Sequence, residues 1–330
     1  FYYMLSFFST FLPEWFVLKV IPNIFLSSLV LIVYLISKEM TGDEKAAVFA
    51  SLISGFIPIL VFKTAVSITE YSLVIPLMFL ALYCFMRVEK PFFMYSFIAI
   101  IFLLAFTHPS VLLLALSLLV YFLLTETEGI KRKLPELELI IFSTLLVVWL
   151  NFVLFRPALL AHGSSVIWQN TPVLVLDKLF TNLDLVQAVA NVSIIPFLMA
   201  VLVIYKYIFV QRDKQVYLFT SFALTVFILL WLKLIEFSTG LMFFGVVISV
   251  LSARYYTSFS SYLKKTRFDR HRLWIILFFV LIVAMSSMIP SFVFGKKAAS
   301  FAVSEQDIIA YEWVHKNTPE DAVIAASLEE

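Results

Sequence analysis

The chain has 330 residues, of which 62% are hydrophobic and 14% are charged, with a formal net charge of +2 and a mean hydropathy of +1.00. A soluble domain carries about 25% charged residues, so this composition excludes an ordinary soluble fold. The small net charge argues against a nucleic-acid partner, and the lone cysteine excludes an internal disulfide. The composition predicts an all-α polytopic membrane protein with about ten transmembrane helices, at roughly 20 residues per span.

The first residues are predicted to precede the membrane bundle. The chain begins at Phe1 with neither an initiator methionine nor a basic signal region, so we interpret it as a fragment that lacks its true N-terminus. Residues 1–12 are apolar but too short to span a bilayer, and Pro13 and Glu14 interrupt them. We therefore expect residues 1–19 to be the tail of an outer loop, with a helix lying in the membrane interface.

Ten apolar runs follow, and they predict a transmembrane helical bundle over residues 20–293. The predicted spans are residues 20–37, 46–62, 72–86, 92–107, 110–124, 138–155, 189–209, 216–232, 239–256 and 273–292. Several are shorter than about 20 residues, so they need flanking aromatic residues or a thinned bilayer. Kinks are predicted at the prolines within or at the edges of these runs, Pro22, Pro58, Pro76, Pro196 and Pro290.

A dense basic stretch between the last two runs sets the orientation. It contains Lys264, Lys265, Arg267, Arg270, His271 and Arg272. Moving so many cations across a bilayer is unfavourable, so this stretch is predicted to stay inside the cell. Alternation of the spans then places 16 of the 24 lysines and arginines inside and 8 outside, with both chain ends outside. We expect a multi-pass protein of the plasma membrane, surrounded by membrane lipids.

The predicted outer face holds the polar side chains that are candidates for chemistry. Lys63 and Glu70 lie in one outer loop, and His108 lies in the tight turn between the fourth and fifth spans. We expect Glu70 and His108 to border one cavity that opens to the outer leaflet. Arg156 and Lys233 lie at the ends of two later spans on the same side.

Two segments on the predicted outer side are not expected to be transmembrane helices. Residues 173–185, within the long outer loop that starts at Arg156, alternate between apolar and polar in a way that predicts an interfacial helix. Residues 294–330 are predicted to begin a truncated extracytoplasmic α/β domain. In that segment Ser304 and Asp307 resemble a capping box that opens a helix, and residues 322–326 predict a short strand.

The order of these features resembles the GT-C superfamily of membrane glycosyltransferases. The resemblance includes the inner turn 38–45, the span 46–62 with its proline, and the outer loop that bears Glu70. Residues 106–113, Phe-Thr-His-Pro-Ser-Val-Leu-Leu, are similar to a turn seen in many members. Residues 313–323 resemble the junction into the extracytoplasmic domain of archaeal oligosaccharyltransferase-like members, and protein mannosyltransferases belong to the same class.

The resemblance implies that a sugar is transferred from a dolichyl or undecaprenyl (polyprenyl) phosphate carrier to a protein or glycolipid acceptor on the outer face. Such a reaction needs a carboxylate to activate the acceptor, and cations or a divalent metal to hold the leaving phosphate. The main acidic residue of the superfamily lies in the first outer loop, which would precede Phe1, and Glu70 corresponds to a second acidic position. The candidate catalytic residues are therefore Glu70 and His108, and the candidate substrate-binding residues are Lys63, Arg156 and Lys233.

The sequence departs from the superfamily pattern at one place, and it contains no established metal motif. Related proteins often carry an outer arginine just before a late span, where it meets the lipid phosphate. The matching stretch here, residues 236–241, reads Glu-Phe-Ser-Thr-Gly-Leu, and Lys233 is the nearest cation in sequence. There is no HExxH, glycine-rich phosphate loop or CxxC pair, so no metal is assigned.

Each candidate residue also has an alternative interpretation in which it has no catalytic or substrate-binding role. Glu70 is alternatively a solvated loop carboxylate, His108 a cap between two spans, and Arg156 a side chain that reaches lipid headgroups. For the whole chain, the alternative is a noncatalytic membrane scaffold, a degenerate glycosyltransferase homologue. A secondary transporter is disfavoured, because the predicted spans contain almost no ionisable groups at mid-membrane depth.

Overall fold

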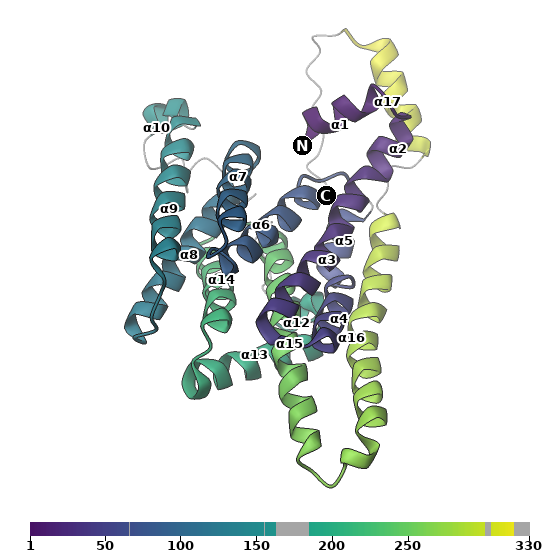
Figure 1. Cartoon of the computed structure of the whole chain (residues 1–330). Helices are drawn as coiled ribbons and strands as arrows, with labels where there is room; N and C mark the ends of the chain where they lie inside the picture. The colour runs from purple at the N-terminus through teal and green to yellow at the C-terminus, as the bar shows by residue number, and fades with distance from the viewer. Residues whose placement is uncertain (66, 155, 163–184, 301–304, 320–330) are drawn as a thin grey trace.

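The chain folds into a bundle of α-helices (Figure 1). The computed structural model describes all residues except 66, 155, 163–184, 301–304 and 320–330. No strand occurs in the part of the chain that is described. The predicted strand 322–326, the capping residue Ser304 and nearly all of the predicted interfacial helix 173–185 lie outside the described residues.

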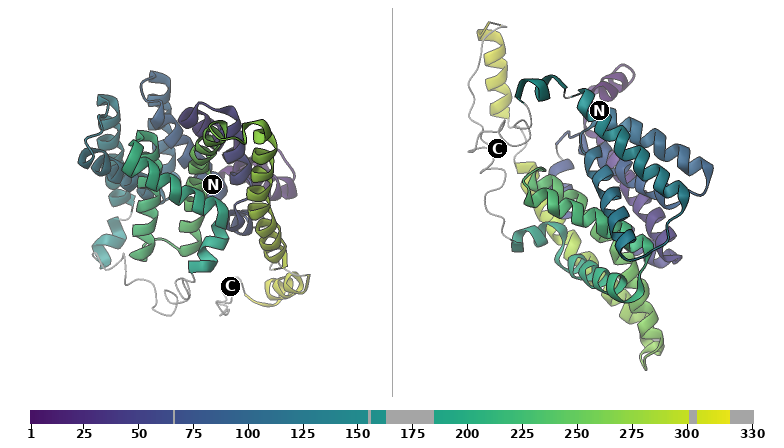
Figure 2. Two further views of the ribbon diagram at one scale, coloured as in Figure 1. Left: turned by 90° about the horizontal axis from the view of Figure 1, so that it is seen from below. Right: turned by 90° about the vertical axis from the view of Figure 1, so that its left-hand side faces the viewer.

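The helices follow the predicted order. The first nine are α1 (Tyr2–Ser9), α2 (Glu14–Lys19), α3 (Ile21–Thr41), α4 (Glu44–Ser54), α5 (Pro58–Thr64), α6 (Tyr71–Met86), α7 (Pro91–Thr107), α8 (Val111–Thr127) and α9 (Leu134–Leu154). The remaining ones are α10 (Arg156–His162), α12 (Leu185–Val192), α13 (Ile194–Lys206), the π-helix η2 (Tyr207–Gln211), α14 (Lys214–Trp231), α15 (Phe237–Lys264), the 3-10 helix η3 (Asp269–His271), α16 (Arg272–Ser300) and α17 (Glu305–Asn317). In Figures 1 and 2, α17 lies at the periphery of the bundle.

Six helices among the described residues are long and apolar enough to cross a membrane. They are Glu14–Thr41, Leu134–Leu154, Ile194–Gln211, Lys214–Trp231, Phe237–Lys264 and Asp269–Ala299. The bent pair α4 and α5 would make a seventh, and α6, α7 and α8 are shorter apolar helices. The described part of the chain therefore has six to seven candidate spans by length and composition.

The second predicted span is broken at the position that its proline indicated. Helix α4 ends at Ser54, α5 begins at Pro58, and the two are bent by 49°. Ile57 has an extended backbone (φ −79°, ψ 115°), which is the conformation that a following proline favours, because the proline ring crowds the helical one. This break directs α5, and with it Lys63, toward the start of α15.

The prediction of one span over residues 189–209 was wrong at its start. The chain turns at Ser193, which has φ 82°, so that α12 and α13 are separate helices. Pro196 explains the break, because a continuous helix would need a backbone N–H at this residue to bond the carbonyl of Val192. In the first turn of a new helix, the missing N–H is tolerated.

Three further boundaries differ from the predictions. Helix α15 continues to Lys264 and α16 continues to Ser300, so both extend beyond the apolar runs, and Figure 1 shows them as a hairpin at the lower edge. Apolar runs mark only the membrane-buried part of a helix, whereas a helix satisfies its own backbone in water too. Residues from Arg156 onward, expected as a loop, begin with the short helix α10, which accommodates Pro157 in its first turn.

Helix α15 is the centre of the bundle. Of its most apolar stretch 78% is buried, compared with 11% for the α16 span, which lies at the edge. Two glycines let neighbours approach α15 closely: a Cβ atom at Gly240 would lie 2.7 Å from the Leu230 side chain, and one at Gly245 would lie 2.7 Å from Ile57.

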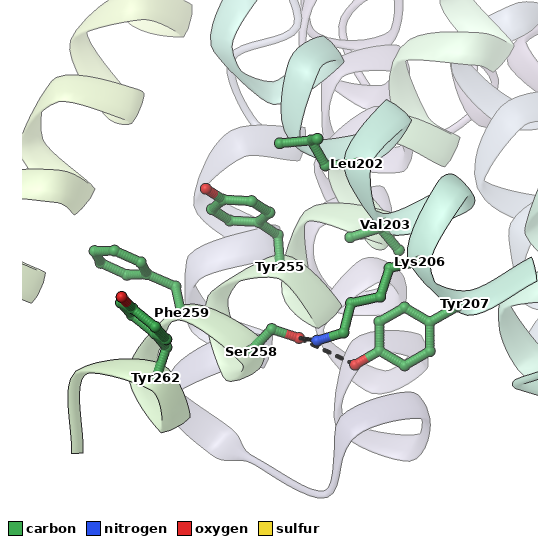
Figure 3. Close-up of a pocket in the computed structure, with 8 residues that line it drawn as sticks. All are labelled: Leu202, Val203, Lys206, Tyr207, Tyr255, Ser258, Phe259 and Tyr262. Atoms are coloured by element: carbon green, nitrogen blue, oxygen red, sulfur yellow. Dashed lines mark hydrogen bonds between the residues drawn. The ribbon is translucent and has the colours of Figure 1, made fainter. Parts of the chain in front are cut away.

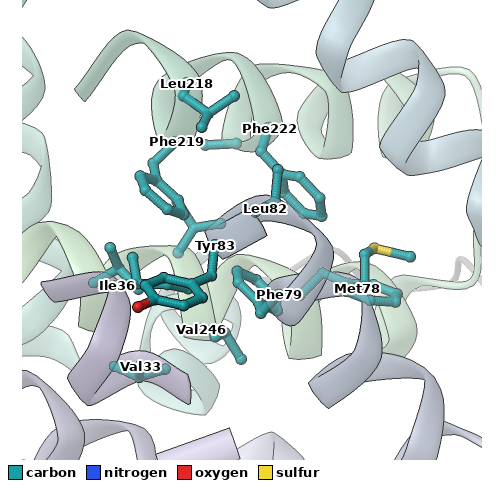
Figure 4. Close-up of a cluster of buried hydrophobic side chains, with 14 of the residues drawn as sticks. Val33, Ile36, Met78, Phe79, Leu82, Tyr83, Leu218, Phe219, Phe222 and Val246 are labelled. Carbon is teal, nitrogen blue, oxygen red and sulfur yellow. The ribbon is translucent and has the colours of Figure 1, made fainter. Parts of the chain in front are cut away.

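A buried apolar cluster joins α15 to α3, α6 and α14 (Figure 4). Phe79 of α6 packs against Phe222 of α14 with ring centroids 5.5 Å apart, and Val33 and Val246 complete the contact from α3 and α15. This packing fixes the helices whose ends carry the polar residues described below.

Ion pairs between distant segments connect turns that the alternation of spans assigns to the same side. On the predicted inner side, Lys214 of α14 lies 2.7 Å from Glu136 of α9, and Arg87 at the end of α6 lies 3.4 Å from Glu39 of α3. Further pairs on that side are Lys133–Glu89, Arg212–Glu128 and Arg254–Asp213. On the predicted outer side are Lys63–Glu236 and His108–Glu70. None of these pairs joins a predicted inner residue to a predicted outer one.

Candidate functional site

A group of polar side chains gathers where α5, α6, α7 and α15 have neighbouring ends. We call it the polar cluster, and its members are Lys63, Glu70, Tyr71, His108, Glu236, Ser238 and Thr239. They come from segments that are far apart in sequence. Three of them, Lys63, Glu70 and His108, are residues that the sequence had marked as candidates.

Local backbone rules place the two carboxylates at helix starts. Glu70 is the N-cap residue of α6 and Glu236 is the N-cap residue of α15. A helix N-terminus carries a partial positive charge, which favours a carboxylate there by about 0.3–1 kcal/mol. His108 ends α7 in an extended conformation (φ −158°, ψ 138°), because Pro109 follows it.

Glu70 and His108 form a carboxylate–imidazole pair. The Nε2 atom of His108 lies 3.4 Å from Oε1 of Glu70. The Nδ1 atom accepts a hydrogen bond from the backbone N–H of Ser110 at 3.0 Å, so it carries no proton of its own in the neutral ring. The remaining proton therefore lies on Nε2, directed toward Glu70.

The burial of His108 keeps this ring neutral. Burial lowers the pKa of His108 below its usual value, and the nearby Glu70 carboxylate opposes that shift without cancelling it. Only 12% of the His108 side chain is exposed, whereas 34% of the Glu70 side chain is. The carboxylate is thus the solvent-accessible member of the pair, and the imidazole orients it.

The second carboxylate of the polar cluster is held by three side chains. Nζ of Lys63 lies 3.6 Å from Oε1 of Glu236, and the Thr239 hydroxyl donates to Oε2 at 3.2 Å. The Ser238 hydroxyl donates to Oε1 as well. Because both Lys63 and Glu236 are about 40% exposed, this ion pair is open to an incoming anion.

Tyr71 connects the two carboxylates. Its ring packs edge-on against His108, with centroids 5.1 Å apart, and against Phe243 at 6.5 Å. Its hydroxyl lies close to Thr239 and within the electrostatic reach of both Glu70 and Glu236. The polar cluster is therefore one continuous site, with an acid–imidazole pair at one side and a lysine–carboxylate pair at the other.

The structure does not bring Arg156 into the contacts of this site. Lys233 lies three residues before Glu236 in the turn that follows α14 and has a left-handed backbone, with φ 56°. Arg156 is exposed at the start of α10 and makes none of the contacts of the polar cluster. The residues that sequence reasoning missed are Tyr71, Glu236, Ser238 and Thr239.

A signal for the missed residues was present in the sequence. The stretch 236–241 matches a superfamily position by its place before a late span. It lacks the arginine of that position, but it brings an acid and two hydroxyls to the start of α15. No group of three or more His, Cys, Asp or Glu side chains placed to hold a metal ion occurs in the described ranges.

Comparison with known proteins identifies the fold. No family model matches the chain, and no curated protein matches it. The apo crystal structure of the Archaeoglobus fulgidus oligosaccharyltransferase superimposes with a TM-score of 0.63 at 15% identity, over 92% of this chain and 47% of that chain. The archaeal oligosaccharyltransferase AglB from Archaeoglobus fulgidus, in complex with an inhibitory peptide and a dolichol-phosphate, gives a TM-score of 0.65 at 15% identity, over 96% and 50% of the two chains.

These similarities define the class. The chain is a multi-pass helical membrane protein that shares its fold with these two oligosaccharyltransferase structures, and it spans about half their length. At 15% identity the similarity concerns the fold alone, so the activity has to be argued from the side chains of the polar cluster.

Proposed function

We propose that this chain belongs to a membrane glycosyltransferase that moves a sugar from a polyprenyl-phosphate carrier to a protein or glycolipid acceptor outside the plasma membrane. One observation carries the proposal. A carboxylate–imidazole pair and a lysine-bound carboxylate converge at one end of a bundle whose fold is that of an oligosaccharyltransferase. One of the two solved structures is in complex with a dolichol-phosphate and a peptide, which supports a lipid-linked donor and a protein acceptor.

Glu70 is assigned the role of accepting the acceptor's proton, with His108 positioning it. An acceptor hydroxyl or amide becomes a nucleophile when a carboxylate within hydrogen-bond reach receives its proton as the bond to the sugar forms. The neutral His108 ring directs its Nε2 proton at one Glu70 oxygen, which leaves the other oxygen for the acceptor.

Lys63 is assigned the role of binding the lipid phosphate, which an arginine has in related proteins. The stretch at the start of α15, where related proteins carry an arginine, has Glu236 instead, and Lys63 reaches it from α5. A phosphate at this place would compete with Glu236 for the lysine, and charge-assisted hydrogen bonds of this kind contribute about 1.5–3 kcal/mol. Lys233 and Arg156 are proposed as outlying donor contacts, and a divalent metal as a further means of holding the phosphate.

The orientation is part of the proposal. We count the six long helices, the bent pair of α4 and α5 as one span, and the three shorter helices α6, α7 and α8. If all of these cross the bilayer, the bundle has the ten spans that the sequence predicts. The shorter helices would then need a locally thinned bilayer. The polar cluster and the segment from residue 294 onward would face the outside, and the basic α15–α16 hairpin would face the cytoplasm.

The test uses the full-length protein, purified and supplied with a polyprenyl-phosphate sugar and a peptide or glycolipid acceptor. Glu70→Gln should lower the transfer rate by about 10²-fold, because the amide has the shape of the carboxylate but cannot accept the proton. Glu312→Gln, on the peripheral helix α17, is a matched control that should leave the rate unchanged.

The scaffold hypothesis makes the opposite prediction. It expects no turnover with any donor and no change in lipid binding on substitution of Glu70 or Lys63. Transfer that is unaffected by Glu70→Gln would exclude this residue as the base, and failure to bind any polyprenyl phosphate would exclude the glycosyltransferase itself.

A further inference from the structure

Two adjoining cavities lie at the opposite end of α15 from the polar cluster. Each has a volume of about 370 Å³, and both are bordered by α13, η2 and the last turns of α15. They share four lining residues: Lys206, Tyr207, Ser258 and Tyr262. Figure 3 shows Lys206 and Tyr207 reaching toward Ser258 from the facing helix.

The two cavities differ in polarity and together form an amphipathic site. The first is lined by apolar and aromatic groups, including Leu202, Val203 and Phe259 (Figure 3). The second adds Thr257, Ser261, Gln211 and Lys265. A ligand that fills both must have a polar head next to an apolar chain.

The polar half of the site has an excess of positive charge. Lys206 and Lys265 line it, and no Asp or Glu lines either cavity. The Lys206 ammonium donates to the Ser258 hydroxyl at 3.2 Å and lies 5.4 Å from the Tyr207 ring centroid, so these two partners are uncharged. Arg254, which also lies over the Tyr207 ring, is already paired with Asp213.

The site lies where the apolar part of α15 gives way to the basic hairpin. Along α15, the fully buried apolar core ends at Ala253, and the basic residues of the hairpin begin at Lys264. The α15 residues that line the cavities run from Tyr255 to Lys265 and so join these two levels; among them, Tyr255 and Tyr262 are aromatic residues of the type found at membrane interfaces. The backbone is distorted at the same level by the π-helix η2, a feature that is frequent at functional sites.

We propose that this site binds an anionic phospholipid of the leaflet opposite the polar cluster. Its phosphate would be held by Lys206 and Lys265 with the Ser258 hydroxyl, and one acyl chain would lie along Leu202 and Phe259. The charge supports an anionic rather than a zwitterionic headgroup, since no carboxylate is available to receive a choline or ethanolamine cation. The site is separate from the transfer chemistry and does not depend on it.

The test measures lipid retention by the purified protein with native mass spectrometry, using phosphatidylglycerol and phosphatidylcholine as probes. We expect phosphatidylglycerol to bind preferentially, and Lys206→Gln with Lys265→Gln to weaken its binding at least tenfold. The binding of phosphatidylcholine should not change. Lys264→Gln is the matched control for Lys265→Gln, because it removes one charge from the neighbouring residue, which does not line the cavities.

A second variant keeps the test independent of charge. Leu202→Trp, at a side chain that is 53% exposed, should fill the apolar cavity and reduce phosphatidylglycerol binding to a similar extent, with an unchanged melting temperature in lipid-free detergent. Equal binding of the two lipids, an equal loss in Lys264→Gln, or displacement of the lipid by millimolar inorganic phosphate would each overturn the proposal. The last result would identify a site for a free anion.

Discussion

The Nε2 atom of His108 lies 3.4 Å from Oε1 of Glu70, although the two residues belong to different turns of the bundle. The other ring nitrogen, Nδ1, accepts a hydrogen bond from the backbone N–H of Ser110. The neutral imidazole therefore has only one tautomer that satisfies both contacts. This pair defines the side of the polar cluster at which a proton would be transferred, and it makes the ionisation of His108 a direct probe of Glu70.

We expect His108 to titrate with a midpoint below 6.5, the usual value, because burial disfavours its charged form more than Glu70 favours it. Glu70→Gln removes the favourable charge, so the pKa of His108 should fall further. NMR of ¹³C-labelled histidine checks this, with His271 in the distant basic hairpin as an internal control. A higher midpoint in the variant would contradict the pairing.

The same shift predicts how the stability of the protein depends on pH. Between the folded-state pKa of His108 and its usual pKa, this residue carries a proton in the unfolded chain but not in the folded protein. The contribution of this residue to folding stability should therefore decrease as the pH falls from about 6.5 through the folded-state pKa. His108→Gln should reduce this slope in thermal unfolding measured from pH 7 to pH 5.

Lys63 and Glu236 should have opposite effects on phosphate binding. Glu236→Gln frees the lysine from its ion-pair partner and should tighten the binding of a polyprenyl phosphate up to about fivefold, since exposed pairs are worth about 0.2–1 kcal/mol. Lys63→Met should weaken it by tenfold or more. Fluorescence quenching by the lipid would measure both. Weaker binding in the Glu236→Gln protein would show that this carboxylate supports the donor directly.

The close packing at Gly245 should be sensitive to added volume. A side chain there meets Ile57 at 2.7 Å, so Gly245→Val should reduce stability by about 1–3 kcal/mol and lower the melting temperature in detergent. Gly295→Ala is the control, because its added Cβ atom would meet Val61 at an ordinary 3.5 Å. An equal effect of the two substitutions would argue against tight packing between α5 and α15.

The orientation can be tested with single cysteines, because the native Cys84 is buried and contributes little background. Lys131→Cys and Lys265→Cys should be protected from an impermeant thiol reagent in intact cells and should react after the cells are opened. Lys296→Cys should react in intact cells. Labelling of the Lys265→Cys protein in intact cells would invert the proposed topology.

Much of the fold could be predicted from the sequence, because hydropathy acts locally. An apolar run long enough to cross a bilayer becomes a helix whatever its neighbours are, since an unpaired backbone in lipid is unfavourable. The ends of α3 and α14 therefore fell close to prediction, as did the kink at Pro58. At Pro196 the sequence predicted a kink within one span. The full break into two helices at Ser193 was not predicted, because the apolar run continues through it.

The amino-acid sequence by itself determined that this is a multi-pass membrane protein and that Glu70 and His108 fall on the same predicted side, because side depends only on the number of spans between two residues. Tertiary structure alone decided which residues on that side meet. Lys63 reaches Glu236, and Lys206 reaches Ser258, through the lateral packing of α5, α13 and α15. That packing depends on side-chain shape and on close contacts such as that of Gly245 with Ile57, which no periodicity in the sequence encodes.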